Sequence, residues 1–334
     1  MILRFCFGWL LLAGLSAGAQ SVEDIIRSSR EYSLKGDLEN AILVLKNGLD
    51  NNPGSSEIRQ ELAMAYYTGK KGSLAIETIK PLMEAGNADE TAFQVAGMLY
   101  KGENQKKEAE KIYKEGLKRY PKSGMLYHDY GLLMESMEPG RGEGLKLWEK
   151  GIEVNPGFAQ NYYQACRYLY ASNNTIWTLL YGEIFVNLDS YSSRTIEIKN
   201  ILFYFYKKMF TYGFGSLNEK NPFEKAVAET FTKQSSLAKM GLNPESLSAI
   251  RTRFILDWYN NPSNEKYPFR LFERHQQMLR DGMFDAYNQW LFGGVANMAS
   301  FQTWTQNHAD EYQAFTKFQR QQLFVVNQNQ SYRQ

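Results

Sequence analysis

Residues 93–121, FQVAGMLYKGENQKKEAEKIYKEGLKRYP, contain the pattern that decides the fold of this 334-residue chain. The second half of the stretch places a small residue at Ala109, a large apolar one at Tyr113, a small one again at Gly116 and a proline at Pro121. Small residues let two antiparallel helices approach closely, and a proline cannot continue a helix. The stretch therefore predicts a helix that packs tightly against its neighbour and ends before Pro121.

The same order of small, large apolar, small and proline residues recurs on either side of this stretch. The other copies are Ala41, Leu45, Gly48 and Pro53, and Gly144, Trp148, Gly151 and Pro156. Their prolines lie roughly two periods before and one period after Pro121, for a period of about 34 residues. A further copy with Leu62, Ala63, Tyr66, Ala75 and Ile79 has Asn87 in place of the proline, and a last one begins at Tyr162 and degenerates past Asn174. This recurrence predicts helix pairs that break near Pro53, Asn87, Pro121 and Pro156.

The start of the quoted stretch completes the pattern. Phe93, the pair Ala96–Gly97 and Tyr100 stand where the tetratricopeptide repeat has tryptophan, leucine-glycine and tyrosine. The chain resembles that family over residues 20–190, with four clear copies and a degenerate fifth. The resemblance implies an all-α fold, a right-handed superhelix of helix hairpins in which each repeat needs stacked neighbours to bury its apolar face. It also implies a binding scaffold, similar to exported tetratricopeptide proteins of Gram-negative bacteria.

In this family the first helix of each repeat lines a concave groove that binds a partner. Projecting the groove sites onto this chain selects Gln60, Met64, Tyr67, Gln94, Met98, His128, Leu132, Tyr163 and Arg167, with Ile26 and Arg30 in the first repeat. Most of these are amides, methionines or leucine, so a clamp for a terminal carboxylate is not expected. Such a lining suits an extended or helical protein segment held by apolar contact. The alternative is that these side chains pack against the C-terminal half of the chain.

The N-terminal residues have the organisation of a secretory signal peptide. Arg4 precedes an apolar run over 5–15, and Ala17-Gly18-Ala19 supplies small residues for cleavage before Gln20. We therefore expect residues 1–19 to be removed and the mature chain to be periplasmic, the alternative being an uncut N-terminal anchor. Only Cys166 would remain, so no internal disulfide is expected.

Residues 191–326 match no family that can be named but are predicted to be helical. The expected helices are Thr195–Phe210, Pro222–Met240, Pro244–Tyr259, Phe269–Arg280, Phe284–Leu291 and Asn297–Phe324. Asn-Pro pairs at 221–222 and 243–244 are typical helix starts, with a cap residue and then proline. The aromatic residues crowded into the last two helices are expected mainly in the core, with a surplus that could form an exposed patch for a partner. Residues 327–334 are expected to be a disordered tail.

No motif for catalysis, a cofactor or a metal is present in the sequence. His128, His275 and His308 are scattered, and none has a second ligand at metal-binding spacing. We expect His275 to be a partly exposed structural residue and Cys166 to be buried and inert. Asp257 and Glu273 are the carboxylates to consider for an enzyme, although isolated acids are mostly surface residues.

The 38 basic and 36 acidic residues are nearly balanced, which gives no electrostatic footprint for nucleic acid. The sequence thus predicts a non-enzymatic periplasmic scaffold without cofactors that binds a partner protein through the repeat groove, in envelope assembly or secretion. One alternative is a subunit of a larger envelope complex that docks through its aromatic half. The other is an unrecognised envelope enzyme acting on saccharide.

Overall fold

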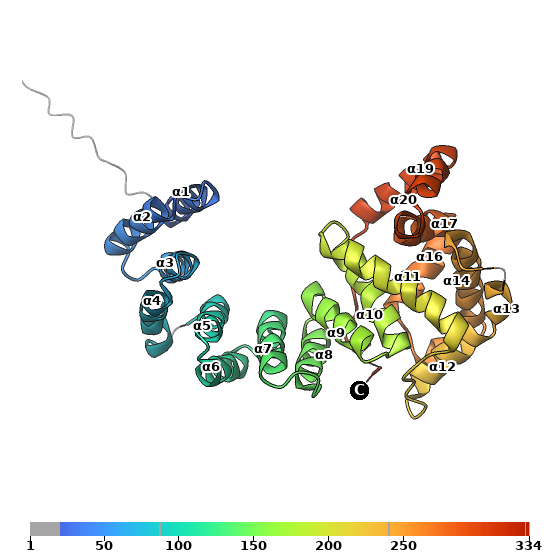
Figure 1. The fold of residues 1–334 in the computed structure, drawn as a ribbon, viewed down its shortest axis with the longest axis horizontal. Helices are drawn as coiled ribbons and strands as arrows, with labels where there is room; N and C mark the ends of the chain where they lie inside the picture. The colour runs from blue at the N-terminus through green and yellow to red at the C-terminus, as the bar shows by residue number, and fades with distance from the viewer. Residues whose placement is uncertain (1–20, 87, 240, 331, 334) are drawn as a thin grey trace, which may run out of the picture. The chain divides into compact units, whose positions relative to one another are not determined.

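The computed structural model describes residues 21–86, 88–239, 241–330 and 332–333. The predicted signal peptide and the predicted break at Asn87 lie outside these residues. The chain divides into two compact units, Met1–Glu103 and Asn104–Gln334. Both are built from helices, as Figure 1 shows, and the prediction of an all-α fold of stacked helix pairs is confirmed.

The first unit contains α1 (Val22–Leu34), α2 (Leu38–Asn51), α3 (Ser56–Thr68), α4 (Gly72–Glu84) and α5 (Glu90–Gly102). Four of these five helices, all except α4, begin at side-chain caps, since Ser21, Asp37, Ser55 and Asp89 each accept a hydrogen bond from a backbone N–H of the first turn. Its helices pack in sequence, and Ile25, Leu45, Ile58 and Leu62 form a small core. Gly48, a small residue of the repeat pattern, lets α2 pack closely against α1. A Cβ on Gly48 would lie only 2.6 Å from Cγ2 of Ile25.

The second unit opens with the remaining repeat helices: α6 (Lys106–Arg119), α7 (Gly124–Met137), α8 (Glu143–Val154), α9 (Ala159–Ala171) and α10 (Thr175–Leu188). The predicted breaks are confirmed at Pro121 and Pro156, where α6 and α8 each end two residues before the proline, as α2 does before Pro53. The helices also approach each other closely at the small residues of the repeat pattern, as predicted. A Cβ on Gly131 of α7 would lie 2.7 Å from Cδ1 of Trp148 on α8, and Trp148 Nε1 donates to the His128 carbonyl at 3.1 Å.

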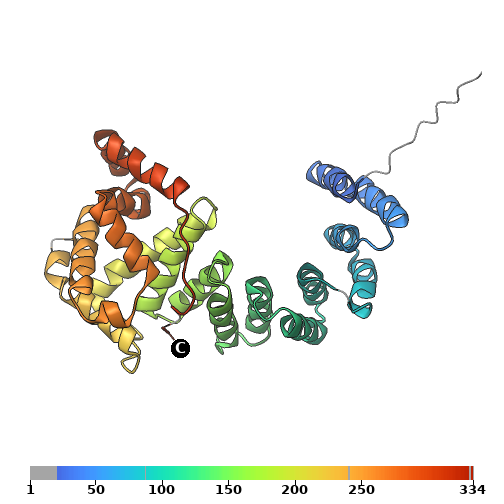
Figure 2. The same cartoon turned by 180° about the vertical axis from the view of Figure 1, so that it is seen from behind.

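Helices continue through the second unit as far as Gln321, and Figure 2 shows them from behind. They are α11 (Arg194–Tyr212), α12 (Pro222–Thr232), α13 (Ser235–Ala238), α14 (Pro244–Tyr259), α15 (Ser263–Lys266), α16 (Arg270–Arg280), α17 (Phe284–Asn288), a π-helical turn η1 (Gln289–Gly293), α18 (Gly294–Ala296), α19 (Met298–Asn307) and α20 (Ala309–Gln321). Asn221 and Asn243 cap α12 and α14 as predicted. One hydrophobic core runs from Leu145 on α8 to Val326, so the predicted boundary at residue 190 falls inside a continuous core.

Three predicted helices in this half differ from the observed ones. The expected helix 297–324 is two helices, because His308 leaves the helical conformation between α19 and α20 (φ −124°, ψ 41°). The expected helix 284–291 is α17 followed by the π-helical turn. The expected helix 222–240 ends at Thr232 and is followed by the short helix α13.

The described residues of the expected disordered tail make specific contacts instead. Tyr332 donates its hydroxyl hydrogen to the Pro268 carbonyl at 2.8 Å, and the Gln330 side chain accepts from the Arg270 backbone at 2.8 Å. An aromatic ring and paired polar groups offset the entropy cost of ordering this segment. No helix among the described residues has both the length and the apolar character needed to cross a membrane.

Candidate partner-binding site

Some of the residues projected onto the groove lie together in the first unit. The first helices of the pairs, α1, α3 and α5, enclose an open hollow of about 280 Å³, named here the N-terminal hollow. It is lined by Ile26, Arg30, Glu57, Gln60, Glu61, Met64, Asp89, Thr91 and Val95. Four of the residues projected onto the groove therefore meet in it: Ile26, Arg30, Gln60 and Met64.

Gln60 connects two helices at the floor of the N-terminal hollow. It is buried, and its Nε2 donates to Ser56 Oγ at 2.8 Å and to the Asp89 carboxylate at 3.1 and 3.3 Å. Asp89 also accepts the backbone N–H of Ala92 at 2.7 Å, as the cap of α5. The amide hydrogens of Gln60 are therefore used within the protein, so toward a ligand this side chain presents its carbonyl oxygen as an acceptor.

The N-terminal hollow carries more negative than positive charge. Arg30 of α1 forms an ion pair with Glu61 of α3, and this partner raises the pKa of the Arg30 guanidinium. Glu57 and Asp89 add two further carboxylates, and Arg30 is the single basic residue in the lining. Met64, Val95 and Ile26 supply apolar surface between these charges. The hollow thus combines an apolar floor with an acidic rim.

The other projected residues of the first unit lie outside this lining. Tyr67, Gln94 and Met98 are half-buried. The ring of Tyr67 occupies space beside Gly102, since a Cβ there would lie 2.7 Å from Cζ of the tyrosine. These residues belong to the same helices α3 and α5 but do not line the hollow.

The projected residues of the second unit form contacts of their own. His128 Nδ1 donates to Asp129 at 2.7 Å, its ring packs edge-on against Phe158, and Leu132 packs against the core. Tyr163 donates its hydroxyl hydrogen to Glu197 at 2.6 Å, and Arg167 Nε lies 3.0 Å from the same carboxylate. The structure thus joins Tyr163 to Arg167 through Glu197, a residue that the sequence pattern did not select.

Five further residues that line the N-terminal hollow were not selected by the sequence pattern: Glu57, Glu61, Asp89, Thr91 and Val95. Asp89 had a usable signal, because an aspartate directly before a helical segment is a typical cap and lies at the mouth of the groove. The two glutamates carried no signal, since acidic residues on a helix are ordinarily read as solvated surface.

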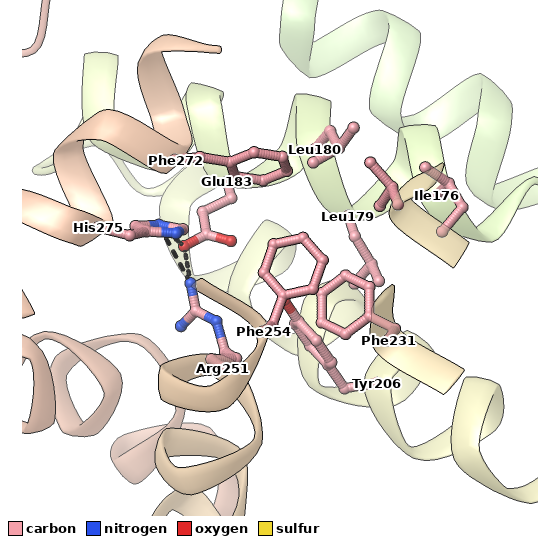
Figure 3. Close-up of a pocket in the computed structure, with 11 residues that line it drawn as sticks. Ile176, Leu179, Leu180, Glu183, Tyr206, Phe231, Arg251, Phe254, Phe272 and His275 are labelled. Carbon is pink, nitrogen blue, oxygen red and sulfur yellow. Dashed lines mark hydrogen bonds and ion pairs between the residues drawn. The ribbon is translucent and has the colours of Figure 1, made fainter. Parts of the chain in front are cut away.

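The second unit contains a buried polar cluster of four side chains, and Figure 3 shows three of them, Glu183, Arg251 and His275. Glu183 of α10 meets Arg251 of α14, His275 of α16 and Tyr287 of α17. His275 Nε2 lies 2.8 Å from Glu183 Oε1, the Tyr287 hydroxyl donates to that oxygen at 2.7 Å, and Arg251 forms an ion pair with it. His275 is therefore buried, which corrects the expectation of a partly exposed residue.

Burial and the charged neighbours together set the pKa values of Glu183 and His275. Burial acts to raise the pKa of Glu183, but Arg251 and His275 favour the carboxylate and bring it to about 2. Burial lowers the pKa of His275 below its ordinary value, against the opposing effect of Glu183. The void beside the cluster measures only about 10 Å³, room for about one water molecule. The cluster therefore ties four helices together and leaves no space for a substrate.

The remaining candidates for chemistry have structural partners. Asp257 accepts from Gln234 Nε2 at 2.6 Å, and Glu273 lies 3.3 Å from Arg270. Cys166 is buried, as predicted, and burial raises the pKa of its thiol. No group of three or more histidine, cysteine or acidic side chains suited to a metal ion occurs within the described part of the chain. Most C-terminal aromatic side chains, including Phe284, Tyr287 and Phe292, are in the core.

Neither a protein-family model nor a curated protein matches this sequence. Among solved structures, a thermophilic tetratricopeptide protein of Thermus thermophilus is similar at 13% identity and a TM-score of 0.45, over 54% of this chain and 98% of that one. PilF of Pseudomonas aeruginosa gives 18% identity and a TM-score of 0.46, over 57% and 85%. A tetratricopeptide protein of Parabacteroides merdae gives 15% and 0.41, over 70% and 98%. These structural neighbours are tetratricopeptide repeat proteins.

Proposed function

We propose that this chain is a non-enzymatic scaffold that binds a segment of a partner protein in the N-terminal hollow. The observation that carries the proposal is the hollow itself, which opens on the first helices of successive helix pairs and brings Gln60 and Met64 together. Its volume of about 280 Å³ is small beside sites for small molecules, which span roughly 300–1,000 Å³. It suits a few side chains of a peptide.

The charge of the hollow indicates the kind of segment that fits. With Arg30 already paired to Glu61, the negative charges of Glu57 and Asp89 are not neutralised by another basic residue of the lining, although both carboxylates accept hydrogen bonds within the protein. A segment with an apolar side chain over Met64 and a lysine or arginine beside Glu57 would match both the floor and the rim. Complementary charge of this kind raises the association rate and selects the partner.

A cross-link placed in the hollow tests this proposal. A photoreactive phenylalanine analogue at Met64 is expected to give a covalent adduct with a partner in envelope extract, identified by mass spectrometry. Leu43 is the matched control position, since it lies on α2 of the same unit and its side chain is 53% exposed. The adduct should also disappear when Glu57→Lys is combined with the Met64 label. Equal adducts from positions 43 and 64 would reject the hollow as the site.

We also propose that the protein acts in the periplasm, in envelope assembly or secretion. The support is the signal-peptide organisation of residues 1–19, with Ala17-Gly18-Ala19 before Gln20. N-terminal sequencing of the mature protein is expected to begin at Gln20, and a chain beginning at Met1 would reject the proposal.

Docking as a subunit of a larger complex is a second candidate, and one observation favours it. Helix α11 exposes Ile196, Tyr204 and Tyr212, the last to 82%. Exposed apolar groups gathered on one helix are typical of contact surfaces. Sedimentation velocity separates the two functions, because an orphaned subunit should self-associate until Tyr204 and Tyr212 are replaced by serine, whereas a scaffold should be monomeric throughout.

A further inference from the structure

The C-terminal segment after α20 crosses the surface of the second unit as a strap, defined here as residues 322–333. It makes contacts at both of its ends: the Gln322 carbonyl accepts from Arg274 Nη2 at 2.7 Å, and the Tyr332 carbonyl accepts from Asn221 Nδ2 at 2.5 Å. Figure 2 shows this segment passing in front of α10 on its way to the C-terminus. The strap is thus an irregular segment laid over a helical surface.

Apolar side chains alternate along the start of the strap. Phe324 and Val326 are 7% and 8% exposed, whereas Leu323 and Val325 are 77% and 63% exposed. This period of two is that of an extended chain with one face buried. Further on, the Tyr332 ring packs against Phe223 with ring centroids 4.8 Å apart. The strap is therefore anchored by two apolar side chains two residues apart and by an aromatic ring six residues later.

The helical surface holds the strap backbone with side chains. Arg270 Nε donates to the Val325 carbonyl at 3.2 Å, in addition to the bonds from Arg274 and Asn221. No backbone–backbone hydrogen bond joins residues 323–330 to another part of the chain as far as the structure describes it. Donors aimed at the carbonyls of an extended segment, with pockets for alternate side chains, are how proteins recognise bound peptides.

The surface under the strap is shaped and charged to match it. Around residues 326–330 it is formed by α8, α9, α10 and the start of α16, with Ile152, Tyr162, Tyr181 and Ile184 facing the strap across a void of only about 10 Å³. At the far end Arg333 forms an ion pair with Glu149 of α8, which is otherwise buried. A buried carboxylate without a cation costs free energy, so this position calls for a basic residue.

We propose that the surface beneath the strap is a second binding site, for a protein segment that has the strap's own pattern and, like the strap, is extended at first and turns at the positions of residues 328–329, and that the strap occupies this site in cis. The pattern is two apolar residues at i and i+2, an aromatic residue six further on and a basic residue directly after it. A partner segment with this pattern displaces the strap and takes over the contacts to Arg270, Arg274, Asn221 and Glu149. The site is separate from the N-terminal hollow and does not depend on it.

Because the strap is covalently attached, its effective concentration determines how much it weakens the binding of a partner segment. A covalently attached segment has an effective concentration of about 1 mM, so a segment that binds with an intrinsic Kd near 10 μM is weakened about 100-fold by the strap in cis. Releasing the strap should therefore raise the affinity for the same segment supplied in trans by at least about tenfold.

The test uses the full chain and a fluorescent peptide of residues 322–334, with binding followed by fluorescence anisotropy. The released variant is Phe324→Ser/Val326→Ser, and its matched control is Leu323→Ser/Val325→Ser, which changes the exposed side chains of the same segment. The released variant is expected to bind the peptide at least about tenfold more tightly than either the wild type or the control. A peptide with serine at 324 and 326 should not bind. Equal affinity for all three proteins, or no binding to any of them, would overturn the proposal.

Circular dichroism shows whether the released variant keeps its helices. If it does not, the wild-type chain labelled with a dye at its C-terminal residue provides the measurement. Unlabelled peptide at several millimolar should then release the strap and lower the anisotropy of the dye, and the serine peptide should not. An anisotropy that stays constant above the effective concentration of the strap would show that the segment is a fixed part of the fold.

Discussion

Glu183 joins more elements of the second unit than any other carboxylate among the described residues. Its Oε1 meets Arg251, His275 and Tyr287, and each of these comes from a different helix. Tyr287 in turn accepts from Asn187 Nδ2 at 2.7 Å. Removing one member of such a buried pair leaves an uncompensated charge and costs about 3–5 kcal/mol. A single residue thus secures the packing of α10, α14, α16 and α17.

This cluster predicts how stability depends on pH. The pKa of His275 is lowered in the folded chain, so the unfolded chain binds more protons below its ordinary value of about 6.5, and stability falls as the pH falls from there. Glu183, with a folded pKa of about 2, adds a second loss between about pH 5 and pH 2. Thermal melting between pH 7 and pH 5 should include this histidine effect, together with contributions from Lys199, whose pKa burial lowers to about 7, and from Glu149, whose pKa burial raises.

The control for this prediction is His275→Gln, which retains a polar side chain but cannot titrate. Its melting temperature should be lower overall and should decline less than that of the wild type from pH 7 to pH 5. A wild-type slope in His275→Gln would assign the pH effect to other groups.

At the scale of elements, the repeat helices were predictable because local chemistry fixes their ends. Prolines stop α2, α6 and α8 two residues after the helix, and small residues mark where partners approach. Asn221 and Asn243 were recognised as caps for the same reason, since a side chain that accepts from the first turn acts within three residues.

Elements fixed by distant contacts were not predictable. The π-helical turn at 289–293 includes Gln289, whose Nε2 donates to Glu245 on α14 at 2.8 Å. The break at His308 involves a local contact instead, since its ring stacks on Trp304 with centroids 4.4 Å apart, but neither proline nor glycine marks the break in the sequence 304–308. Among the site residues, Gln60 and Met64 followed from the repeat register, whereas Glu61 and Glu197 carried no local signal. The strap escaped prediction because it gains order from residues distant in sequence, such as Asn221, Arg270 and Glu149.

Packing between paired elements gives a second prediction. Replacing Gly131→Val should cost about 1–3 kcal/mol, because the new side chain overlaps Trp148 on the partner helix. Gly157→Val is the matched control in the same unit, since the atom nearest to a Cβ there is Asn155 Oδ1 at 3.8 Å. Denaturant unfolding measures both. Equal free energies of unfolding for the two variants would show that α7 and α8 can move apart without a loss of stability.

On the scale of the whole molecule, the two units differ in how they are stabilised. The first has a small core that includes Ile25, Leu45 and Ile58, and depends on its own helix pairs. The second has a core that begins at α8 and extends through the C-terminal helices to Val326, reinforced by the buried cluster at Glu183. Repeat proteins open locally where nearest-neighbour contacts are few. The unit that contains the N-terminal hollow is therefore expected to be the less stable one.

Hydrogen exchange on two glycine variants tests this difference. Gly48→Val overlaps Ile25 in the first unit, and Gly131→Val overlaps Trp148 in the second. Gly48→Val should speed exchange on α1 to α4, while amides of α10 and α14 keep wild-type protection because their core and the Glu183 cluster are intact. If α10 and α14 lost protection equally in Gly48→Val, the chain would unfold as one cooperative unit. Binding at the N-terminal hollow would then stabilise both units against unfolding.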